Sequence, residues 1–338
     1  MCGQRSAVRL HEPVGRSAEA AGCAAACALA LALLGCGGSA TEGSDGSVDA
    51  GRPSDGASPM DGDSGGEAGG PDAGGGDASG DAGDVPCRGV CGTPGCGECP
   101  DAEMVTVMTP SGASYEIDAT EVTNAQYAAF LATDPALETP DDKCTWNGSF
   151  EPSTESRGCD EWEFRPAEQP DHPIVCVDWC DARSFCRWAG KRLCGGLGEP
   201  AMAVTDTTNP EVDQWYNACS ESGALEFPYG NSYDPTRCVT NDFDGMSLTQ
   251  EGSDVLLPVR TASDCHGRVA PFDRIFDMNG NAKEWEDACN AGLGPDIRCV
   301  VRGGSFRSSQ FSASCPNDDG MNTRSWTRDN LGFRCCRG

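Results

Sequence analysis

Three short stretches near the end of the chain decide its fold: DMNGNAKEWEDAC at 277–289, RGGSF at 302–306 and NLGFRCC at 330–336. The first predicts a Gly-Asn turn that leads into a buried tryptophan, Trp285. RGGSF predicts a strand whose glycines allow close packing, with Arg302 in a buried ion pair or hydrogen bond. All 11 Phe, 7 Trp and 5 Tyr lie from residue 115 onward, so the core belongs to the C-terminal part.

Local signals upstream of these stretches predict the first regular elements. MVTV at 104–107 and the stretch 114–117 predict two strands joined by a Pro-Ser-Gly turn. In EVTNAQYAAFLATDP, Thr123 is expected to cap a helix that Pro135 ends.

A third block, HPIVCVDWCDARSFCRWAGKRL at 172–193, predicts a strand over 173–177 followed by a helix. Asp178 is the expected N-cap of that helix, and Gly190 is expected to close it. A further helix is expected to begin at Asn209-Pro210 and to run through Cys219.

The first 36 residues predict an export signal. Their apolar run at 20–35 is shorter than the roughly 20 residues of a membrane-spanning helix. The run ends in Leu-Leu-Gly-Cys36, which resembles a bacterial lipobox. We favour lipidation of Cys36 over an ordinary secretory signal, which would make the membrane a partner through a lipid anchor. Because residue 37 is Gly rather than Asp, an outer-membrane lipoprotein is expected.

Residues 37–86 predict a disordered linker, because they are rich in Gly, Asp, Ser and Ala and lack aromatic residues. The whole chain carries a formal net charge of −29, and the part after the linker is acidic in its own right. Nucleic acid is therefore not an expected partner.

Cysteine usage agrees with export. The chain has 22 Cys, and the even number left after the four in the leader indicates disulfides formed in an oxidising compartment. Four of them, spaced Cys-x3-Cys-x4-Cys-x2-Cys, lie in a Cys-rich neck at 87–100. They could form a four-thiolate zinc knot or two disulfides, and the oxidising context favours the disulfides.

In combination, the motifs of residues 101–338 resemble the formylglycine-generating enzyme, or sulfatase-modifying factor, family. The resemblance implies one C-type-lectin-like α+β domain, disulfide-rich and with much irregular backbone. It also implies two catalytic copper-binding cysteines, at the positions that Ser308 and Ala313 occupy here. A hydroxyl and a methyl cannot replace two thiolates that hold Cu(I), so no copper is expected and no catalytic residue is assigned.

The resemblance further implies the disulfides and metal ligands of the domain. The implied pairs are Cys186–Cys335 and Cys219–Cys315. A structural calcium ion is implied at Asn281 and Glu284, and a second at Asn241 and the carbonyl of Asp242. The alternative for the first site is a plain Gly-Asn turn with Glu284 in solvent.

Fold alone does not give function. Our first hypothesis is a non-catalytic, membrane-tethered extracytoplasmic domain that binds a glycan, a peptide or an envelope protein through the groove used by catalytic members. The alternative is an oxidoreductase, or sulfatase-modifying type of enzyme, with a rearranged active site. A purely structural role in the cell envelope is a third reading.

Overall fold

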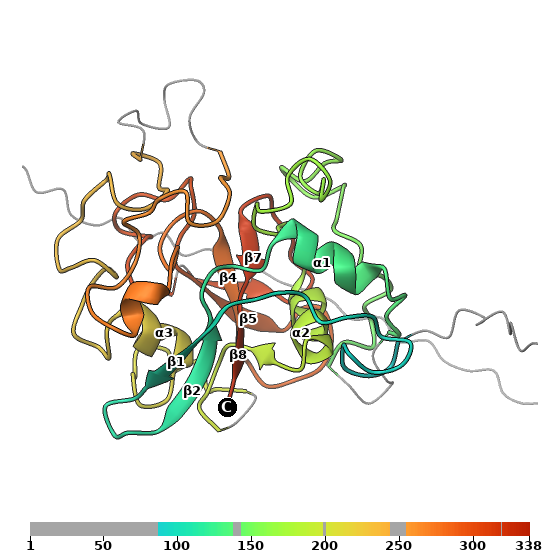
Figure 1. The fold of residues 1–338 in the computed structure, drawn as a ribbon, viewed down its shortest axis with the longest axis horizontal. Helices are drawn as coiled ribbons and strands as arrows, with labels where there is room; N and C mark the ends of the chain where they lie inside the picture. The colour runs from blue at the N-terminus through green and yellow to red at the C-terminus, as the bar shows by residue number, and fades with distance from the viewer. Residues whose placement is uncertain (1–86, 138–142, 199–200, 244–254, 319) are drawn as a thin grey trace, which may run out of the picture. The chain divides into compact units, whose positions relative to one another are not determined.

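The computed structural model describes residues 87–137, 143–198, 201–243, 255–318 and 320–338 (Figure 1). The predicted leader and linker, including Cys36, lie outside these residues. The described part is a mixed α+β fold with short elements and long irregular connections. No helix within it is both long enough and apolar enough to cross a membrane.

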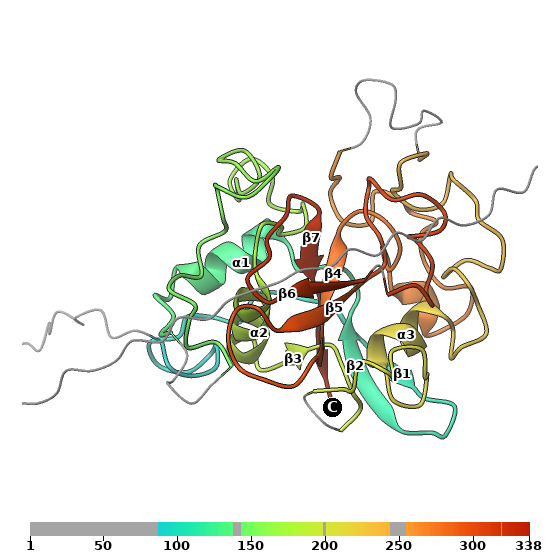
Figure 2. The same ribbon diagram turned by 180° about the vertical axis from the view of Figure 1, so that it is seen from behind.

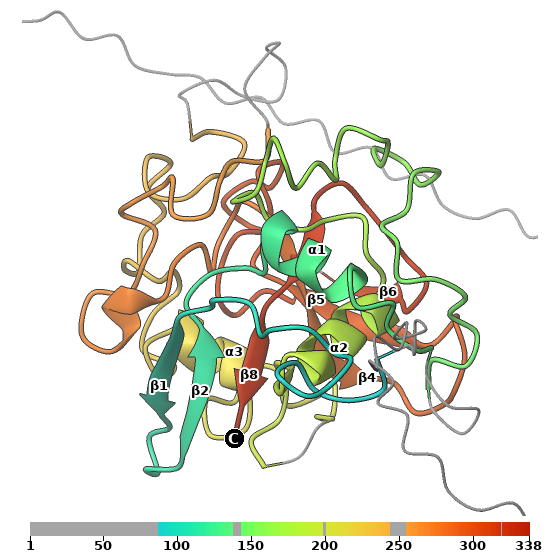
Figure 3. The same cartoon turned by 45° about the vertical axis from the view of Figure 1, so that its right-hand side comes forward.

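One four-stranded antiparallel sheet contains the N-terminal hairpin and the C-terminal strand. Its strands, in spatial order, are β1 (Met104–Met108), β2 (Ser114–Asp118), β8 (Cys335–Arg337) and β3 (Arg192–Leu193). Figure 3 shows β8 beside the hairpin. The predicted hairpin is confirmed, and its alternating pattern buries Val105, Val107 and Ile117 on one face.

The second sheet carries the sequence stretches that decide the fold. Its order is β6 (Met321–Thr323), β5 (Arg298–Arg302), β4 (Lys283–Cys289) and β7 (Leu331–Phe333). Strands β4 and β7 are parallel, whereas β5 is antiparallel to both of its neighbours. The fully buried Trp285 of β4 donates its indole N–H to the carbonyl of Val177 at 3.2 Å.

Two helices lie side by side, and the second of them packs against strand β4 (Figures 1 and 2). Helix α1 (Asn124–Leu131) begins with the predicted cap, because the hydroxyl of Thr123 and the side chain of Gln126 form a capping box. Helix α2 (Trp179–Trp188) has the predicted N-cap at Asp178. It is closed as predicted by Gly190, whose φ of 69° suits glycine.

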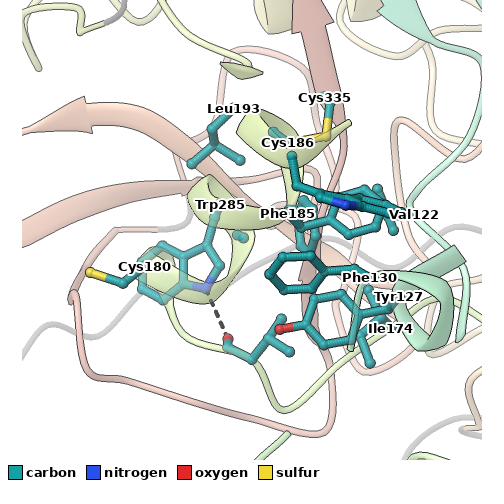
Figure 4. Packing of buried hydrophobic residues seen from close by; sticks show 14 of the residues in the cluster. Val122, Tyr127, Phe130, Ile174, Cys180, Phe185, Cys186, Leu193, Trp285 and Cys335 are labelled. Atoms are coloured by element: carbon teal, nitrogen blue, oxygen red, sulfur yellow. Dashed lines mark hydrogen bonds between the residues drawn. A yellow bond between two sulfur atoms is a disulfide. The ribbon is translucent and has the colours of Figure 1, made fainter. Parts of the chain in front are cut away.

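Aromatic side chains from α1, α2 and β7 form the centre of the core, and Figure 4 shows those of the two helices. Tyr127 stacks on Phe185 with 5.7 Å between ring centroids, and Phe130 meets Phe185 edge to face at 5.8 Å. Phe185 also contacts Phe333 of β7 at 5.5 Å. Because each such side chain stabilises the fold by about 2 kcal/mol when buried, this cluster fixes β7 against the helices.

Two expected elements differ in the structure. The predicted strand over 173–177 is wrong. Only Pro173 forms an isolated bridge, and Cys176 takes a φ of 63° that interrupts extended backbone. The helix expected from Asn209 begins later, as α3 (Gln214–Cys219), because Asp213 rather than Asn209 caps it. A short 3-10 helix, η1 (Phe272–Arg274), precedes the second sheet.

Nine disulfides join all the cysteines of the described residues. In the neck, Cys87 pairs with Cys96 and Cys91 with Cys99, so this structure has the disulfide form of the two alternatives. The neck also bonds to α2, because Trp188 donates its indole N–H to the carbonyl of Cys96 at 3.0 Å.

Candidate functional site

The turn after β5 brings the two substituted positions together. Strand β5 ends at Arg302, so the strand predicted over RGGSF is wrong beyond that residue. The reason is the backbone of Gly303 and Gly304, whose φ angles are 83° and 69°. A Cβ on Gly304 would lie 2.9 Å from the Cα of Ala313 and 3.0 Å from the Cβ of Ser308. Ser308 and Ala313 therefore flank one glycine.

Neither of these two side chains offers a soft metal ligand. Ser308 is buried, and its Oγ accepts a hydrogen bond from the backbone N–H of Ser305 at 2.9 Å. Ala313 is also buried and carries only a methyl group. The hydroxyl of Ser308 thus completes a local turn, and its neighbour has no lone pair to offer.

The cysteines that lie nearest in the sequence are also committed to disulfides. Cys315 pairs with Cys219, and Cys335 with Cys186, which are the two pairs that the resemblance implies. Cys336, the second of the tandem pair, joins Cys194. Among the described residues no thiol remains to act as a nucleophile or to bind copper.

At the first expected calcium site, the side chain of Arg334 lies against the carboxylate of Glu284. Both carboxylate oxygens of Glu284 accept from the guanidinium of Arg334 at 2.8–2.9 Å, and the indole N–H of Trp215 donates to Oε2 at 2.8 Å. Asn281 exchanges two hydrogen bonds with the backbone of Leu257. A cation at Glu284 would compete with Arg334, so the two side chains do not fit a shared calcium ion.

The second expected site keeps an available oxygen. Asn241 is buried, and its Oδ1 has no hydrogen-bond partner in the described part of the chain. Its backbone N–H donates to the carbonyl of Ser308 at 3.2 Å. The side chain of Asp242 is half-buried and lies 3.4 Å from the hydroxyl of Tyr233. A side-chain oxygen beside a carbonyl suits a hard cation, so Asn241 and Asp242 fit calcium.

A buried ion cluster lies under the turn after β5. Arg302 is fully buried and bonds Asp213 at 3.2 Å, and its Nε lies 3.7 Å from Glu286. Burial raises the pKa of Glu286 well above its ordinary value, and the charge of Asp213 raises it further. Two carboxyl groups next to one guanidinium thus disfavour each other's ionisation, and burial raises the pKa of Asp213 as well, although the charge of Arg302 opposes this rise. Arg302 has the buried ion-pairing role expected from the sequence.

A second group of buried carboxyls surrounds Arg334. Burial raises the pKa of Glu121 well above its ordinary value, and the nearby Asp277 raises it further. Burial also raises the pKa of Asp277 to about 6, although the backbone N–H of Arg260 donates to its carboxylate. The burial of Glu121 and Asp277 was not predicted from the sequence. In a chain with many acidic residues, the sequence does not indicate which carboxyl groups lie in the core.

A pocket of about 530 Å³ opens next to the Ser305–Ser308 turn. The amide of Asn330, which lines it, donates to the hydroxyl of Ser305 at 2.9 Å. Arg307 also lines the pocket and forms an ion pair with Asp329 at 2.6 Å. Its remaining polar or aromatic lining residues are Arg157, Lys283, Asn322, Trp326 and Arg328.

The walls of this pocket are fixed to one another. Cys159 is joined to Cys176, and the backbone N–H of Cys176 donates to the carbonyl of Arg328 at 2.9 Å. Gly158 lies directly on Asp329, because a Cβ at Gly158 would come within 2.3 Å of that carboxylate. The segments 157–159 and 328–330 are thus held together although they are far apart in sequence. No short motif could have indicated this pocket.

Comparison with known protein families gives a match over most of the described residues. The model of the sulfatase-modifying factor enzyme 1-like domain matches residues 92–338, so the chain belongs to that family. The expected α+β fold with many disulfides and much irregular backbone is confirmed. The match begins inside the neck.

The chain is similar to active and inactive relatives. It is 30% identical to the "Inactive C-alpha-formylglycine-generating enzyme 2" of Bos taurus over 51% of this chain and 52% of that protein. It is 26% identical to the "Formylglycine-generating enzyme" of Streptomyces coelicolor over 65% of this chain and 77% of that one. The chain therefore spans about half the length of the first relative. The solved structure of CarF aligns with a TM-score of 0.45 and 16% identity over 70% of this chain and 98% of CarF.

Proposed function

We propose that residues 101–338 form a non-catalytic binding domain that takes a glycan, a peptide or an envelope protein. One observation carries the proposal: Ser308 and Ala313 stand side by side where the resemblance implies copper-binding cysteines. Soft sulfur ligands are what Cu(I) requires, and neither side chain supplies one. The similarity to a relative named as inactive supports the same reading.

The surface proposed for binding is the pocket beside the Ser305–Ser308 turn. It is concave, and its volume of about 530 Å³ lies within the range of ordinary ligand sites. Arg307 and Asn330 connect it to the turn through an ion pair and a hydrogen bond. A ligand there would lie next to the turn that carries Ser308, one of the two substituted positions.

The nine disulfides indicate an oxidising, extracytoplasmic location. The finer location is part of the proposal. We infer that the chain is tethered to the outer membrane through a lipid on Cys36, with residues 37–86 as the spacer. The acidic folded part makes nucleic acid a poor partner.

Copper binding tests the non-catalytic proposal. The Ser308→Cys/Ala313→Cys double variant should bind Cu(I) at least about 100-fold more tightly than the wild type, because it restores two adjacent thiols. The matched control is Ser309→Cys/Ser312→Cys, which adds two thiols to the same turn and should gain less. Competition with a coloured Cu(I) chelator measures all three affinities.

The same samples test the alternative oxidoreductase. They are incubated with a cysteine-containing peptide and copper, and mass spectrometry follows conversion of the cysteine to an aldehyde. We expect no conversion by the wild type. Tight Cu(I) binding or peptide oxidation by the wild type would overturn the proposal and favour an enzyme with a rearranged site.

A further inference from the structure

The pocket beside the Ser305–Ser308 turn has a charge opposite to that of the chain around it. From residue 87 onward the sequence contains twice as many acidic as basic side chains. Among the pocket's lining residues this ratio is reversed, since four are basic and Asp329 is the single carboxylate. Arg307 already neutralises Asp329 through an ion pair at 2.6 Å. The positive charges of Arg157 and Arg328 in the same lining predict an anionic ligand.

The backbone that carries two of the basic side chains is fixed before any ligand arrives. Arg157 lies two residues from the Cys159–Cys176 disulfide, and the carbonyl of Arg328 accepts from the N–H of Cys176. Arg328 also stacks over the ring of Trp326, with its guanidinium carbon 4.8 Å from the ring centroid. The stacked guanidinium of Arg328 loses less conformational entropy on binding than a free one, and the planar fork of either arginine suits the oxygens of a carboxylate or sulfate.

The neutral lining residues favour a sugar as the carrier of that negative charge. Asn322 and Asn330 bring amides, which both donate to and accept from hydroxyl groups. The indole N–H of Trp326 is buried and has no hydrogen-bond partner among the described residues. A volume of about 530 Å³ suits one or two sugar units and not a folded protein.

From these contacts we propose that the pocket binds an acidic saccharide, in which a carboxylate or a sulfate ester meets Arg157 and Arg328. The inference rests on the proposed binding function and names its ligand class. The guanidinium groups would hold the acidic group, and the amides and the indole N–H would hold the hydroxyls. A nucleic acid does not fit, because the acidic surface outside the pocket would repel it.

Calorimetry with di-galacturonate tests the proposal, and its dimethyl ester serves as the matched neutral ligand. The acid should bind the wild type at least about 10-fold more tightly than the ester, and raised salt should weaken it. Arg157→Gln and Arg328→Gln should each weaken binding of the acid about 10-fold, since each removes one charge-assisted contact. Arg88→Gln, an identical change beside a separate pocket, should bind like the wild type.

Three further ligands separate the remaining readings. A sulfated disaccharide should behave like the diacid, whereas inorganic sulfate should bind at least about 10-fold more weakly because it lacks hydroxyls. If inorganic sulfate binds as tightly as the sulfated disaccharide, the pocket is a simple anion site and the saccharide proposal is wrong. Equal or tighter binding of tetra-aspartate through the same arginines would show an acidic-peptide site instead.

Two outcomes overturn the proposal directly. One is a failure of both acidic saccharides to bind at millimolar concentration, and the other is equal binding of acid and ester. Circular dichroism melts of the variants show whether each is folded. None of these outcomes depends on the copper measurements. The proposal of a non-catalytic function and the proposal of an acidic-saccharide ligand are therefore tested independently.

Discussion

At the residue scale, the interior of the domain is notable for buried carboxyl groups beside arginines. Glu284 is paired with Arg334, and Asp213 and Glu286 share Arg302. The two arginines are completely buried, so their ion pairs cost desolvation that the charge attraction and the hydrogen bonds to Glu284 and Asp213 must offset. Buried carboxyl groups outside these ion pairs, such as that of Asp277, make the stability of the fold depend on pH.

Asp277→Asn should change the pH dependence of folding. The folded-state pKa of Asp277 is about 6 against an ordinary value of 3.8, so its stabilising contribution is complete below pH 4 and is lost as the pH rises through 6. Asparagine keeps the hydrogen-bond acceptor for Arg260 and tolerates the φ of 56°. We expect the variant to be about 1–3 kcal/mol more stable than the wild type at pH 7 and to show a flatter profile.

Urea unfolding between pH 4 and 8 measures this effect. The matched control is Asp273→Asn, an identical change at an exposed position of η1. Its profile should follow that of the wild type. Parallel profiles for Asp277→Asn and the wild type would show that Asp277 is ionised in the folded protein throughout this range.

At the element scale, the sequence predicted correctly the helix caps and the hairpin, which depend on contacts between residues close together in the chain. The caps Thr123 and Asp178 and the hairpin over 104–117 follow from side chains that bond their own neighbours. The extended run expected at 173–177 does not form a strand, because the Cys159–Cys176 disulfide and long-range hydrogen bonds fix its backbone. The basic pocket also escaped prediction, since residues more than a hundred positions apart form it.

Calcium binding stays a prediction, and it concerns how elements are joined. The segment that holds Asn241 bonds to the turn after β5 through Ser308 and to the turn before β4 through Asn281. A calcium ion at Asn241 and Asp242 would join these connections further. Adding calcium to chelator-treated protein should raise its melting temperature by several degrees, and Asn241→Ala should abolish the rise.

Magnesium is the control ion, because its smaller shell demands near-octahedral ligands and should give a smaller rise. Glu284→Gln tests the other expected site. If calcium raises the melting temperature of Asn241→Ala but not that of Glu284→Gln, the ion binds at Asn281 and Glu284 despite Arg334. A melting temperature that calcium leaves unchanged would contradict both sites.

At the scale of the whole molecule, the chain combines a folded family domain with a long N-terminal segment of different composition. The family match begins at residue 92, and the sequence before it predicts an export signal and a linker. Composition predicts this division, because the aromatic residues that build an apolar core occur only from residue 115 onward. The tether itself lies outside the described residues and stays a prediction.

Cys36→Ser should release the protein from the membrane. If Cys36 carries the lipid, the wild type will enter the detergent phase on phase separation, and the variant will stay in the aqueous phase. Cys27→Ser, within the apolar run of the leader, is the matched control and should behave like the wild type. A Cys36→Ser variant that still enters the detergent phase would exclude this anchor.

The paired cysteines of the long connection between α1 and α2 have a further consequence. Cys144 is joined to Cys180 and Cys159 to Cys176, so both covalent links span this irregular stretch. If a protease cuts the backbone between residues 160 and 175, the two fragments remain connected through Cys159–Cys176. Outside the cell, where proteases are common, a cut in this connection need not separate Arg157 from Arg328. The domain can thus survive damage that would dismantle a loop held by hydrogen bonds alone.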